Sequence, residues 1–418
     1  MNACETRALP ANTVFYGDDR STDDSGLPFE FGTVLEDPNT GNIFTLLDFL
    51  GSGSYAVVYR ARDEATGSTC ALKCLSKLSL SEEMLALQKI EVSMHQAVGR
   101  HQNIVQLESF FETSDWLFLV LEYCEGEDLF NWINRNADYQ ADGQPGYQAE
   151  IDRLRTIKLI FDQILDAVLF CHQNSVYHRD LKPENFMVTR NGVVKLTDFG
   201  LATAEEYSTD YECGSKPYLS YESRNFYRAP YSSRQADIWS LGIIFLNLLY
   251  HQCPWDDPSA GESEVFASFM KDKVSFLRQK FECPREVAEF LATQVFCLES
   301  DHGRKGRINL LQWKCWCTDL VKNYVASFFE ETWHDGSIDI PAHRSRQEEG
   351  ALFSAGESSK SSWTEDLDDD EEMDFNEPVH FDDEDYDSAY GSFSMKSGFS
   401  HEDDIAAALE DEFGSLQL

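Results

Sequence analysis

The stretch His178-Arg179-Asp180-Leu181-Lys182-Pro183-Glu184-Asn185 says more about the fold than any other part of this chain. It places a carboxylate, an ammonium group and an amide on one short loop, and Asp198-Phe199-Gly200 adds a second carboxylate downstream. Phosphoryl transfer needs this set, because one group orients a nucleophilic hydroxyl and oxygen ligands hold the magnesium ions that neutralise phosphates. Such a string is very improbable by chance, so the signal is strong.

Two features nearer the start of the chain suit a nucleotide. Gly51-Ser52-Gly53-Ser54-Tyr55-Ala56-Val57-Val58 lies between two predicted strands, and its glycines let backbone amides approach phosphates. Gly-Ser turns are also common in plain hairpins, so this signal is weak alone. Lys73 follows at the end of the third predicted strand. A lone lysine on a strand is normally a solvated edge residue. Only the spacing of Lys73 after the glycine-rich stretch that ends at Val58 favours a phosphate-binding role.

Together these motifs resemble the eukaryotic protein kinase family, in its order and at its spacings, over roughly residues 43–317. Lys182, two residues after Asp180, is typical of the Ser/Thr type. The stretch Cys213–Glu222 resembles fungal kinases of the meiosis and nutrient-response group. The resemblance implies an α+β, bilobal fold, in which a small lobe with a five-stranded antiparallel sheet precedes a larger, mainly helical lobe.

The resemblance assigns roles within the catalytic loop. Asp180 would accept or orient the proton of the substrate hydroxyl, and Lys182 would place a positive charge beside the transferring phosphate. Asn185 would complete the catalytic set and, with Asp198, would hold Mg²⁺. A degraded, inactive relative would lack one of these groups or Lys73, and all of them are present.

For the nucleotide, the resemblance implies that Lys73 grips the α- and β-phosphates of ATP and pairs with Glu91. Glu82 and Glu83 are nearer to Lys73 but lie at a helix start, where capping explains them. Asp128 matches a ribose-binding acid, although an exposed, solvated aspartate is the alternative. Ala56 stands where the family has a third glycine, and we expect its methyl group to be tolerated. The other expected ATP-binding residues are Leu50, Gly51, Gly53, Val58, Ala71, Leu121, Glu122, Cys124 and Met187.

A further set of residues would have structural or regulatory roles by resemblance. Phe199 would pack the lobes together, Ser215 would bridge Asp180 and Lys182, and Asp237 would anchor the catalytic loop. Glu222 would pair with a buried arginine, for which Arg307 has the family spacing. His95 stands where the family prefers an aliphatic residue beside Phe199. It either loosens its helix or is a satisfied core histidine, and we favour the second.

The usual activating phosphorylation position, three residues before Gly214, holds Tyr211 between Asp210 and Glu212. Arg179 would normally bind that phosphate. We hypothesise that Asp210 or Glu212 supplies the negative charge instead. The alternative is a flexible acidic loop without a regulatory role, and the sequence does not separate the two.

The pattern of the chain gives its organisation. Short apolar, β-branched runs predict strands at 43–50, 56–61, 69–74, 104–108 and 116–121. The helical spacing of apolar residues over 81–98 predicts a helix there. Long helices are predicted at 151–172 and 237–250, and 137–146 resembles a surface insertion. We expect an irregular leader over 1–42, a kinase domain over 43–317 (lobes 43–122 and 123–317), a helical extension over 318–336 and an acidic, disordered tail over 337–418.

Charge and cysteine usage limit the partners and the compartment. The net charge is −40, and residues 351–418 hold 21 acidic and 2 basic residues, as in a solvated tail. This balance argues against binding nucleic acid or anionic membranes, which need clustered Lys and Arg. The eleven cysteines are scattered, which suits reduced thiols in the cytoplasm, the nucleus or both. The longest apolar run, 241–249, is about half a membrane span.

The sequence therefore predicts a Ser/Thr protein kinase that uses ATP and Mg²⁺ and acts on proteins in fungal nutrient or meiotic signalling. A scaffold that binds ATP without turnover and a small-molecule kinase are the alternatives. The second should lack Lys182, Ser215 and the Glu222 segment. Residues 404–418 have apolar side chains at helical spacing, which would suit a partner-binding helix, although fraying disorder is the better expectation.

Overall fold

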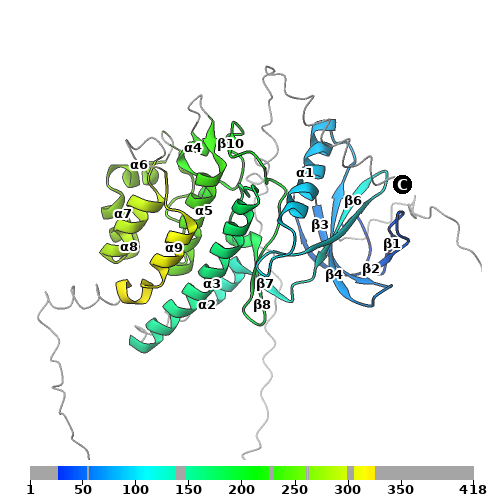
Figure 1. Ribbon diagram of the computed structural model, residues 1–418, viewed down its shortest axis with the longest axis horizontal. Coiled ribbons are helices and arrows are strands. Elements are labelled where there is room, and N and C mark those ends of the chain that lie inside the picture. Colours follow the sequence, from blue (N-terminus) through cyan, green and yellow to red (C-terminus); the bar gives the residue numbers. More distant parts are fainter. Residues whose placement is uncertain are drawn as a thin grey trace, which may run out of the picture.

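The computed structural model describes residues 27–53, 56–137, 147–225, 230–259, 261, 263–298 and 306–324. They form two lobes, a small lobe built on a sheet and a larger lobe of helices (Figure 1). This confirms the predicted bilobal α+β fold. The expectations for residues 1–26, for most of the insertion at 137–146, for the end of the helical extension, for the acidic tail and for the segment 404–418 lie outside the described residues.

The small lobe contains a six-stranded sheet in the order β1-β2-β3-β4-β6-β5, with every neighbouring pair antiparallel. Along β4, side chains alternate between two apolar clusters, with Cys70, Leu72 and Cys74 on one face and Ala71 and Leu75 on the other. The strands are β1 Val34–Glu36, β2 Ile43–Ser52, β3 Ala56–Asp63, β4 Thr69–Ser76, β5 Leu107–Glu112 and β6 Trp116–Glu122.

The prediction of five strands was wrong by one. The additional strand, β1, lies within the segment expected to be an irregular leader, and its three residues are too few to show an alternating pattern. Leu35 is buried opposite Phe44, and the Phe29 ring packs 4.8 Å from the ring of Trp116. Burying an apolar side chain contributes roughly 1.5–3 kcal/mol. Tertiary packing therefore adds this short strand to the edge of the sheet, beside β2.

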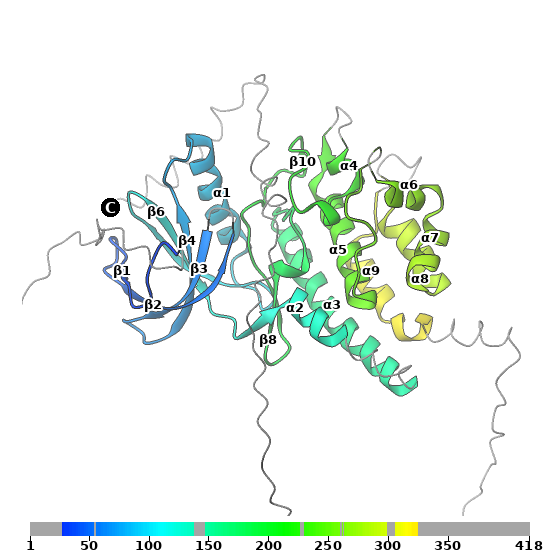
Figure 2. The same cartoon turned by 180° about the vertical axis from the view of Figure 1, so that it is seen from behind.

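A second difference concerns the strand predicted at 104–108, because β5 begins only at Leu107. Ile104 and Val105 instead contact Leu196 of the larger lobe, through an isolated bridge and a backbone hydrogen bond of 2.8 Å. Helix α1 runs from Glu82 to Val98, and the Ser81 hydroxyl caps it by accepting from the Met84 amide. Two opposite views place α1 on the side of the small lobe that faces the larger lobe (Figures 1 and 2).

The larger lobe is mainly helical, and short strands carry its functional loops. Its α-helices are α2 Leu129–Ala137, α3 Tyr147–Gln173, α4 Tyr221–Arg224, α5 Ser233–Tyr250, α6 Glu264–Lys271, α7 Lys273–Phe281, α8 Arg285–Phe290 and α9 Leu310–Cys317. A three-stranded sheet contains β7 Gly126–Asp128, β8 Phe186–Thr189 and β9 Val194–Leu196, and a two-stranded sheet contains β10 Tyr207–Ser208 and β11 Tyr231–Ser232.

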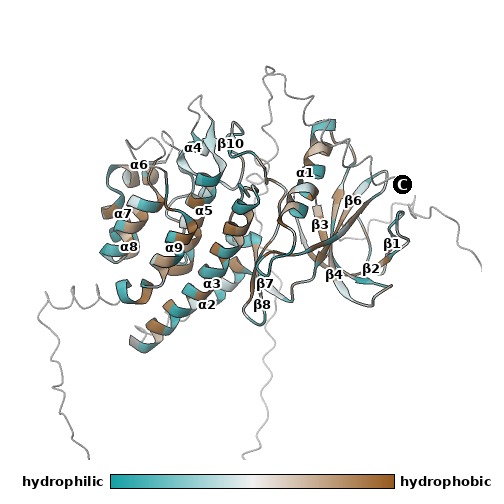
Figure 3. Ribbon diagram, in the orientation of Figure 1, coloured by the Kyte–Doolittle hydropathy of each residue, from teal (hydrophilic) through white to brown (hydrophobic). Residues whose placement is uncertain are grey.

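Helix α5 forms the centre of the larger lobe. All but a few of its side chains are buried, as its nearly unbroken apolar sequence predicted. It begins four residues before the predicted start because the Ser232 hydroxyl caps it by accepting from the Gln235 amide. Helix α3 is longer than predicted and alternates between apolar and polar residues, as a helix with one buried side should (Figure 3). Within the described residues, no helix is long and apolar enough to cross a membrane.

Candidate functional site

The catalytic loop lies between α3 and β8, and Asp237 of the buried helix α5 anchors its backbone. The carboxylate of Asp237 accepts from the backbone amides of His178 at 2.9 Å and Arg179 at 2.8 Å. His172, near the end of α3, contacts the same carboxylate at 2.8 Å. Arg179 has a φ of 64°, a conformation that a non-glycine residue keeps only when its surroundings impose it. Asp237 therefore fixes the backbone from which Asp180 projects.

The Asp180 carboxylate is held by three donors from two segments. One oxygen, Oδ1, accepts from the Ser215 amide at 2.9 Å. The other, Oδ2, lies 3.1 Å from the Lys182 ammonium and accepts from the Asn185 amide group at 3.2 Å. Lys182 also donates to the Ser215 hydroxyl at 2.8 Å. The structure thus brings Asp180, Lys182, Asn185 and Ser215 into one cluster, in which a carboxylate and a cation lie side by side.

Lys73, on β4 of the small lobe, reaches Asp198 of the larger lobe. Its ammonium group lies 2.6 Å from Glu91 of α1 and 2.7 Å from Asp198 of the larger lobe. Burial opposes a charge on Lys73, but the two carboxylates outweigh it and raise the pKa of the ammonium group. In return, the charge on Lys73 lowers the pKa of Asp198 to about 2. Lys73 and Asp198 therefore carry their charges at neutral pH, whereas burial raises the pKa of Glu91 against the opposing effect of Lys73.

A row of rings holds α1 against the larger lobe. The Phe199 ring is fully buried, with the His95 ring 4.7 Å and the His178 ring 5.2 Å from it. His95 is also buried, and its Nε2 makes a 2.7 Å hydrogen bond with the carbonyl of Val105. His95 is therefore the satisfied core histidine that we favoured, and it links α1 to the segment before β5.

The residues expected around the nucleotide gather on the inner side of the small lobe. Val58, Ala71, Leu121 and Cys124 belong to one apolar cluster, and β4 pairs Ala71 with Leu121 and Lys73 with Val58. Gly51 and Gly53 have open space where a side chain would begin, and Leu50 is exposed. Met187, on β8, lies opposite Asp128 on β7.

Two of these residues use their side chains for contacts that the sequence did not indicate. Asp128 accepts from both the backbone and the side-chain amide of Asn131 at 2.7 Å, so its carboxylate caps the start of α2. The Glu122 carboxylate accepts from Lys195 at 3.0 Å. A role for Glu122 in binding adenine would therefore fall to its backbone.

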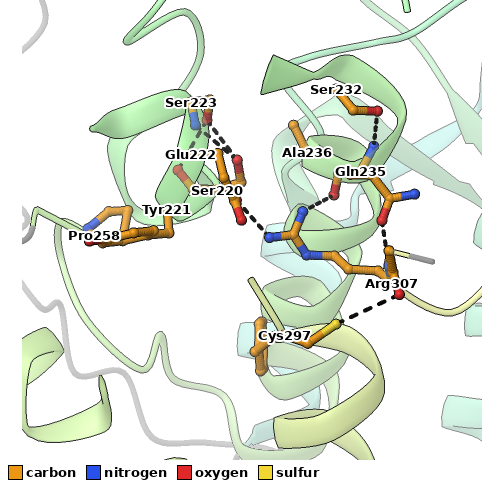
Figure 4. Close-up of polar contacts among 12 residues, drawn as sticks. Ser220, Tyr221, Glu222, Ser223, Ser232, Gln235, Ala236, Pro258, Cys297 and Arg307 are labelled. Carbon is orange, nitrogen blue, oxygen red and sulfur yellow. Dashed lines mark hydrogen bonds and ion pairs between the residues drawn. The ribbon is translucent and has the colours of Figure 1, made fainter. Parts of the chain in front are cut away.

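The segment that follows Gly200 is tied down at both ends. Near its start, Arg179 donates to the Leu201 carbonyl at 2.8 Å, and in its middle Arg179 contacts the Asp210 carboxylate at 2.8 Å. At its end, Glu222 forms a 2.7 Å ion pair with Arg307, whose side chain is fully buried (Figure 4). Arg307 also donates to the carbonyl of Gln235 at 2.9 Å. This pair fastens the segment to α5.

Several functional contacts had no signal in the sequence. The strands β10 and β11 are two residues each and pair Tyr207 with Ser232 and Ser208 with Tyr231. His172 shares Asp237 with the catalytic loop although 65 residues separate them. Neither a motif nor a periodicity marks such pairs, because they form only when distant segments pack together.

Comparisons with known proteins agree with this geometry. The chain matches the family described as "Protein kinase domain" over residues 44–324. It is 33% identical over 258 residues to the "Negative regulator of sexual conjugation and meiosis" of Schizosaccharomyces pombe, an overlap of 57% of this chain and 53% of that protein. It is 35% identical over 237 residues to "Serine/threonine-protein kinase ksp1" of the same yeast (54% and 47%). It is 33% identical over 274 residues to "CBL-interacting protein kinase 11" of Oryza sativa subsp. japonica (64% and 50%).

The chain thus spans about half the length of these relatives, which are found in fungi and in plants. The predicted resemblance to Ser/Thr kinases that include a fungal regulator of meiosis is confirmed. Because the family match extends over well more than half of its residues, this chain belongs to the protein kinase family.

Proposed function

We propose that this chain is a Ser/Thr protein kinase, which transfers the γ-phosphate of ATP to hydroxyl groups of proteins. The observation that carries the proposal is the cluster around Asp180, in which Lys182 and Ser215 are linked by a 2.8 Å hydrogen bond. Two of the similar proteins are named as serine/threonine-protein kinases, which also supports the proposal. The alternative of an ATP-binding scaffold without turnover is an outcome of the test below.

In this mechanism Asp180 would orient the incoming hydroxyl and receive its proton as the new bond to phosphorus forms. Lys182 would stabilise the charge that develops on the transferring group, since it lies 3.1 Å from Asp180. Lys73, held by Glu91, would keep the remaining phosphates in place from the opposite lobe. Each group is already held by a partner, so little reorganisation is needed when the substrates bind.

The residues present fit a magnesium ion. Asn185 donates its amide protons to the Asp180 carbonyl at 2.8 Å and to the Asp180 carboxylate, which leaves the amide oxygen as a ligand. Asp198 adds a carboxylate that keeps its charge beside Lys73. The described part of the chain holds no group of three or more His, Cys, Asp or Glu that could bind a metal. Mg²⁺ commonly takes only one or two protein carboxylates and completes its shell with phosphates and water. Bound there, it would neutralise the phosphate charge.

The test uses the full chain with ATP labelled in the γ-phosphate, Mg²⁺ and three peptide pools that carry Ser, Thr or Tyr as the only hydroxyl residue. We expect label on the Ser and Thr pools, little on the Tyr pool, and none after EDTA removes the metal. Binding of ATP without transfer to any pool would overturn the proposal in favour of a scaffold. Preferential labelling of the Tyr pool would overturn the Ser/Thr assignment.

We also propose that the kinase works inside the cell, on protein substrates in nutrient or meiotic signalling. The similarity to the Schizosaccharomyces pombe regulator of conjugation and meiosis supports this pathway, and the ten cysteines of the described residues are free thiols. A partner protein for residues 404–418, and the lack of binding to nucleic acid or membranes, stay predictions from the sequence. Quantitative phosphoproteomics after acute inhibition tests the pathway, and unchanged sites in meiotic and nutrient-response proteins would contradict it.

A further inference from the structure

Arg179 immediately precedes Asp180, and its guanidinium group is buried with 9% of the side chain exposed. It donates through Nε to the carbonyl of Leu201 at 2.8 Å, and through Nη1 to the Ser208 hydroxyl at 3.3 Å and the Asp210 carboxylate at 2.8 Å. A buried cation is costly unless an opposite charge compensates it. Among the described contacts of Arg179, Asp210 is the residue that supplies that charge.

Asp210 is itself fixed by contacts from two segments. Its amide donates to the Ser208 hydroxyl at 3.1 Å, and its carbonyl accepts from the Tyr231 hydroxyl at 3.0 Å. Ser208 and Tyr231 are paired residues of β10 and β11. This small sheet therefore delivers the Asp210 carboxylate to Arg179 at a defined position.

Glu212, the other acidic residue beside Tyr211, has a different partner. Its carboxylate pairs with Arg224 at 2.5 Å, and its amide donates to the carbonyl of Ser223 at 2.9 Å. Arg224 is also held by Asp257 through two hydrogen bonds of 2.7 and 2.8 Å. The structure thus separates the two candidates that the sequence left open, because only Asp210 reaches the arginine of the catalytic loop.

We propose that Asp210 is a positioning residue for phosphotransfer. Through Arg179 it supplies the negative charge that orders the catalytic loop, so the chain needs no phosphate on the segment between Gly200 and Glu222. This inference rests on the proposed kinase activity.

The connection from Asp210 to the reacting groups is short. Arg179 lies next to Asp180, and the same segment returns to the loop at Gly214, whose φ is +114°. A side chain at Gly214 would begin 2.5 Å from the Arg179 carbonyl, so the two backbones are in close contact there. The next residue, Ser215, donates its amide to Asp180. Releasing Arg179 from Asp210 should therefore disturb the position of Asp180.

Ser208 is a poor site for an activating phosphate. It is buried, and its hydroxyl already contacts both Arg179 and the amide of Asp210. A phosphate at this position would bring two negative charges beside the Asp210 carboxylate. Ser208 therefore helps to hold the Asp210 carboxylate beside Arg179.

The experiment compares the full-length wild type with variants made in bacteria, treated with phosphatase and shown by intact mass to carry no phosphate. The wild type should keep its activity after phosphatase. Asp210→Asn should lower kcat roughly 10- to 100-fold, which is the effect expected when a hydrogen bond between charged groups is lost. The KM for ATP should change less than about threefold. Asp210→Glu should restore most of kcat. Since the Asp210 side chain is 44% exposed, we expect these variants to fold, and their thermal midpoints check this.

Glu212→Gln is the matched control, because Arg224 keeps Asp257 as a partner and none of the described contacts of Glu212 involves the catalytic loop. It should stay within about twofold of the wild type. Asp210→Asn should also add no further loss to an Arg179→Ala variant, since both remove the same interaction. Loss of wild-type activity on phosphatase treatment would overturn the inference, and so would full activity in Asp210→Asn or an equal loss in Glu212→Gln. A wild type without any phosphotransfer would instead defeat the proposed function.

Discussion

At the scale of single residues, Ser215 makes two separable contacts with the catalytic loop. Its amide donates to Asp180 and its hydroxyl accepts from Lys182. Ser215→Ala removes only the second contact, so the charge on Lys182 loses its orientation while Asp180 stays held. We predict that kcat falls about tenfold, the value of one hydrogen bond to a charged group, and that Ser215→Thr restores it. Steady-state kinetics checks this, and an unchanged kcat in the alanine variant would show that the hydroxyl contact is not used.

His95 gives a prediction about pH and stability. Burial, more than any neighbouring charge, lowers the pKa of His95 to about 4 from an ordinary value of 6.5. Between these values the unfolded chain binds a proton on this ring that the folded chain does not. The free energy of unfolding should therefore fall as the pH drops from 6.5 towards 4.

Replacing His95 with leucine removes this dependence. We predict that, between pH 7.5 and 5.0, the unfolding free energy of His95→Leu improves relative to the wild type by about 2 kcal/mol. Urea unfolding at the two pH values measures the difference, and the other histidines cancel because both proteins contain them. A difference between the two proteins that does not change with pH would contradict the buried, neutral state of His95.

At the scale of elements, the Glu222–Arg307 pair joins α4 to α5 and to the chain before α9. Glu222→Ala would leave the Arg307 guanidinium buried without its carboxylate. We predict a loss of about 3 kcal/mol in unfolding free energy, since removing one partner of a buried ion pair is strongly destabilising.

The pair Arg285–Glu289 on α8 is the matched control. It has the same 2.7 Å separation, but its side chains are 70% and 49% exposed. Glu289→Ala should cost less than about 1 kcal/mol, because water screens exposed pairs. Equal losses in the two alanine variants, measured by urea unfolding, would show that burial does not determine the strength of these pairs.

The elements themselves were largely predictable, for a physical reason. Helix α5 and the middle of strand β4 are mostly apolar and largely buried, and that composition is visible in the sequence. Strand β1 was not predictable, because three residues show no periodicity and only packing against β2 stabilises them. The start of β5 was placed three residues too early because Ile104, although apolar, packs against the other lobe.

At the scale of the whole molecule, the site is assembled from both lobes. The sequence named the chemical groups, since Lys73, Asp180, Asn185 and Asp198 lie in recognisable motifs. It did not determine which acidic residue of the segment after Gly200 would face Arg179, because that depends on the pairing of β10 with β11. It also did not show that the Asp128 side chain contacts Asn131 and that the Glu122 side chain contacts Lys195. Motifs thus give the chemistry, and tertiary packing decides which neighbours each group has.

We infer that phosphotransfer by this molecule depends on Asp180, which is held by Ser215, Lys182 and Asn185. The most direct measurement is the rate of single-turnover transfer from ATP to a Ser peptide in the wild type and in Asp180→Asn, with ATP affinity measured in both. If Asp180 has this role, we expect a fall in rate of roughly 10²- to 10⁴-fold with ATP affinity nearly unchanged. A rate in Asp180→Asn within a few-fold of the wild type would contradict it.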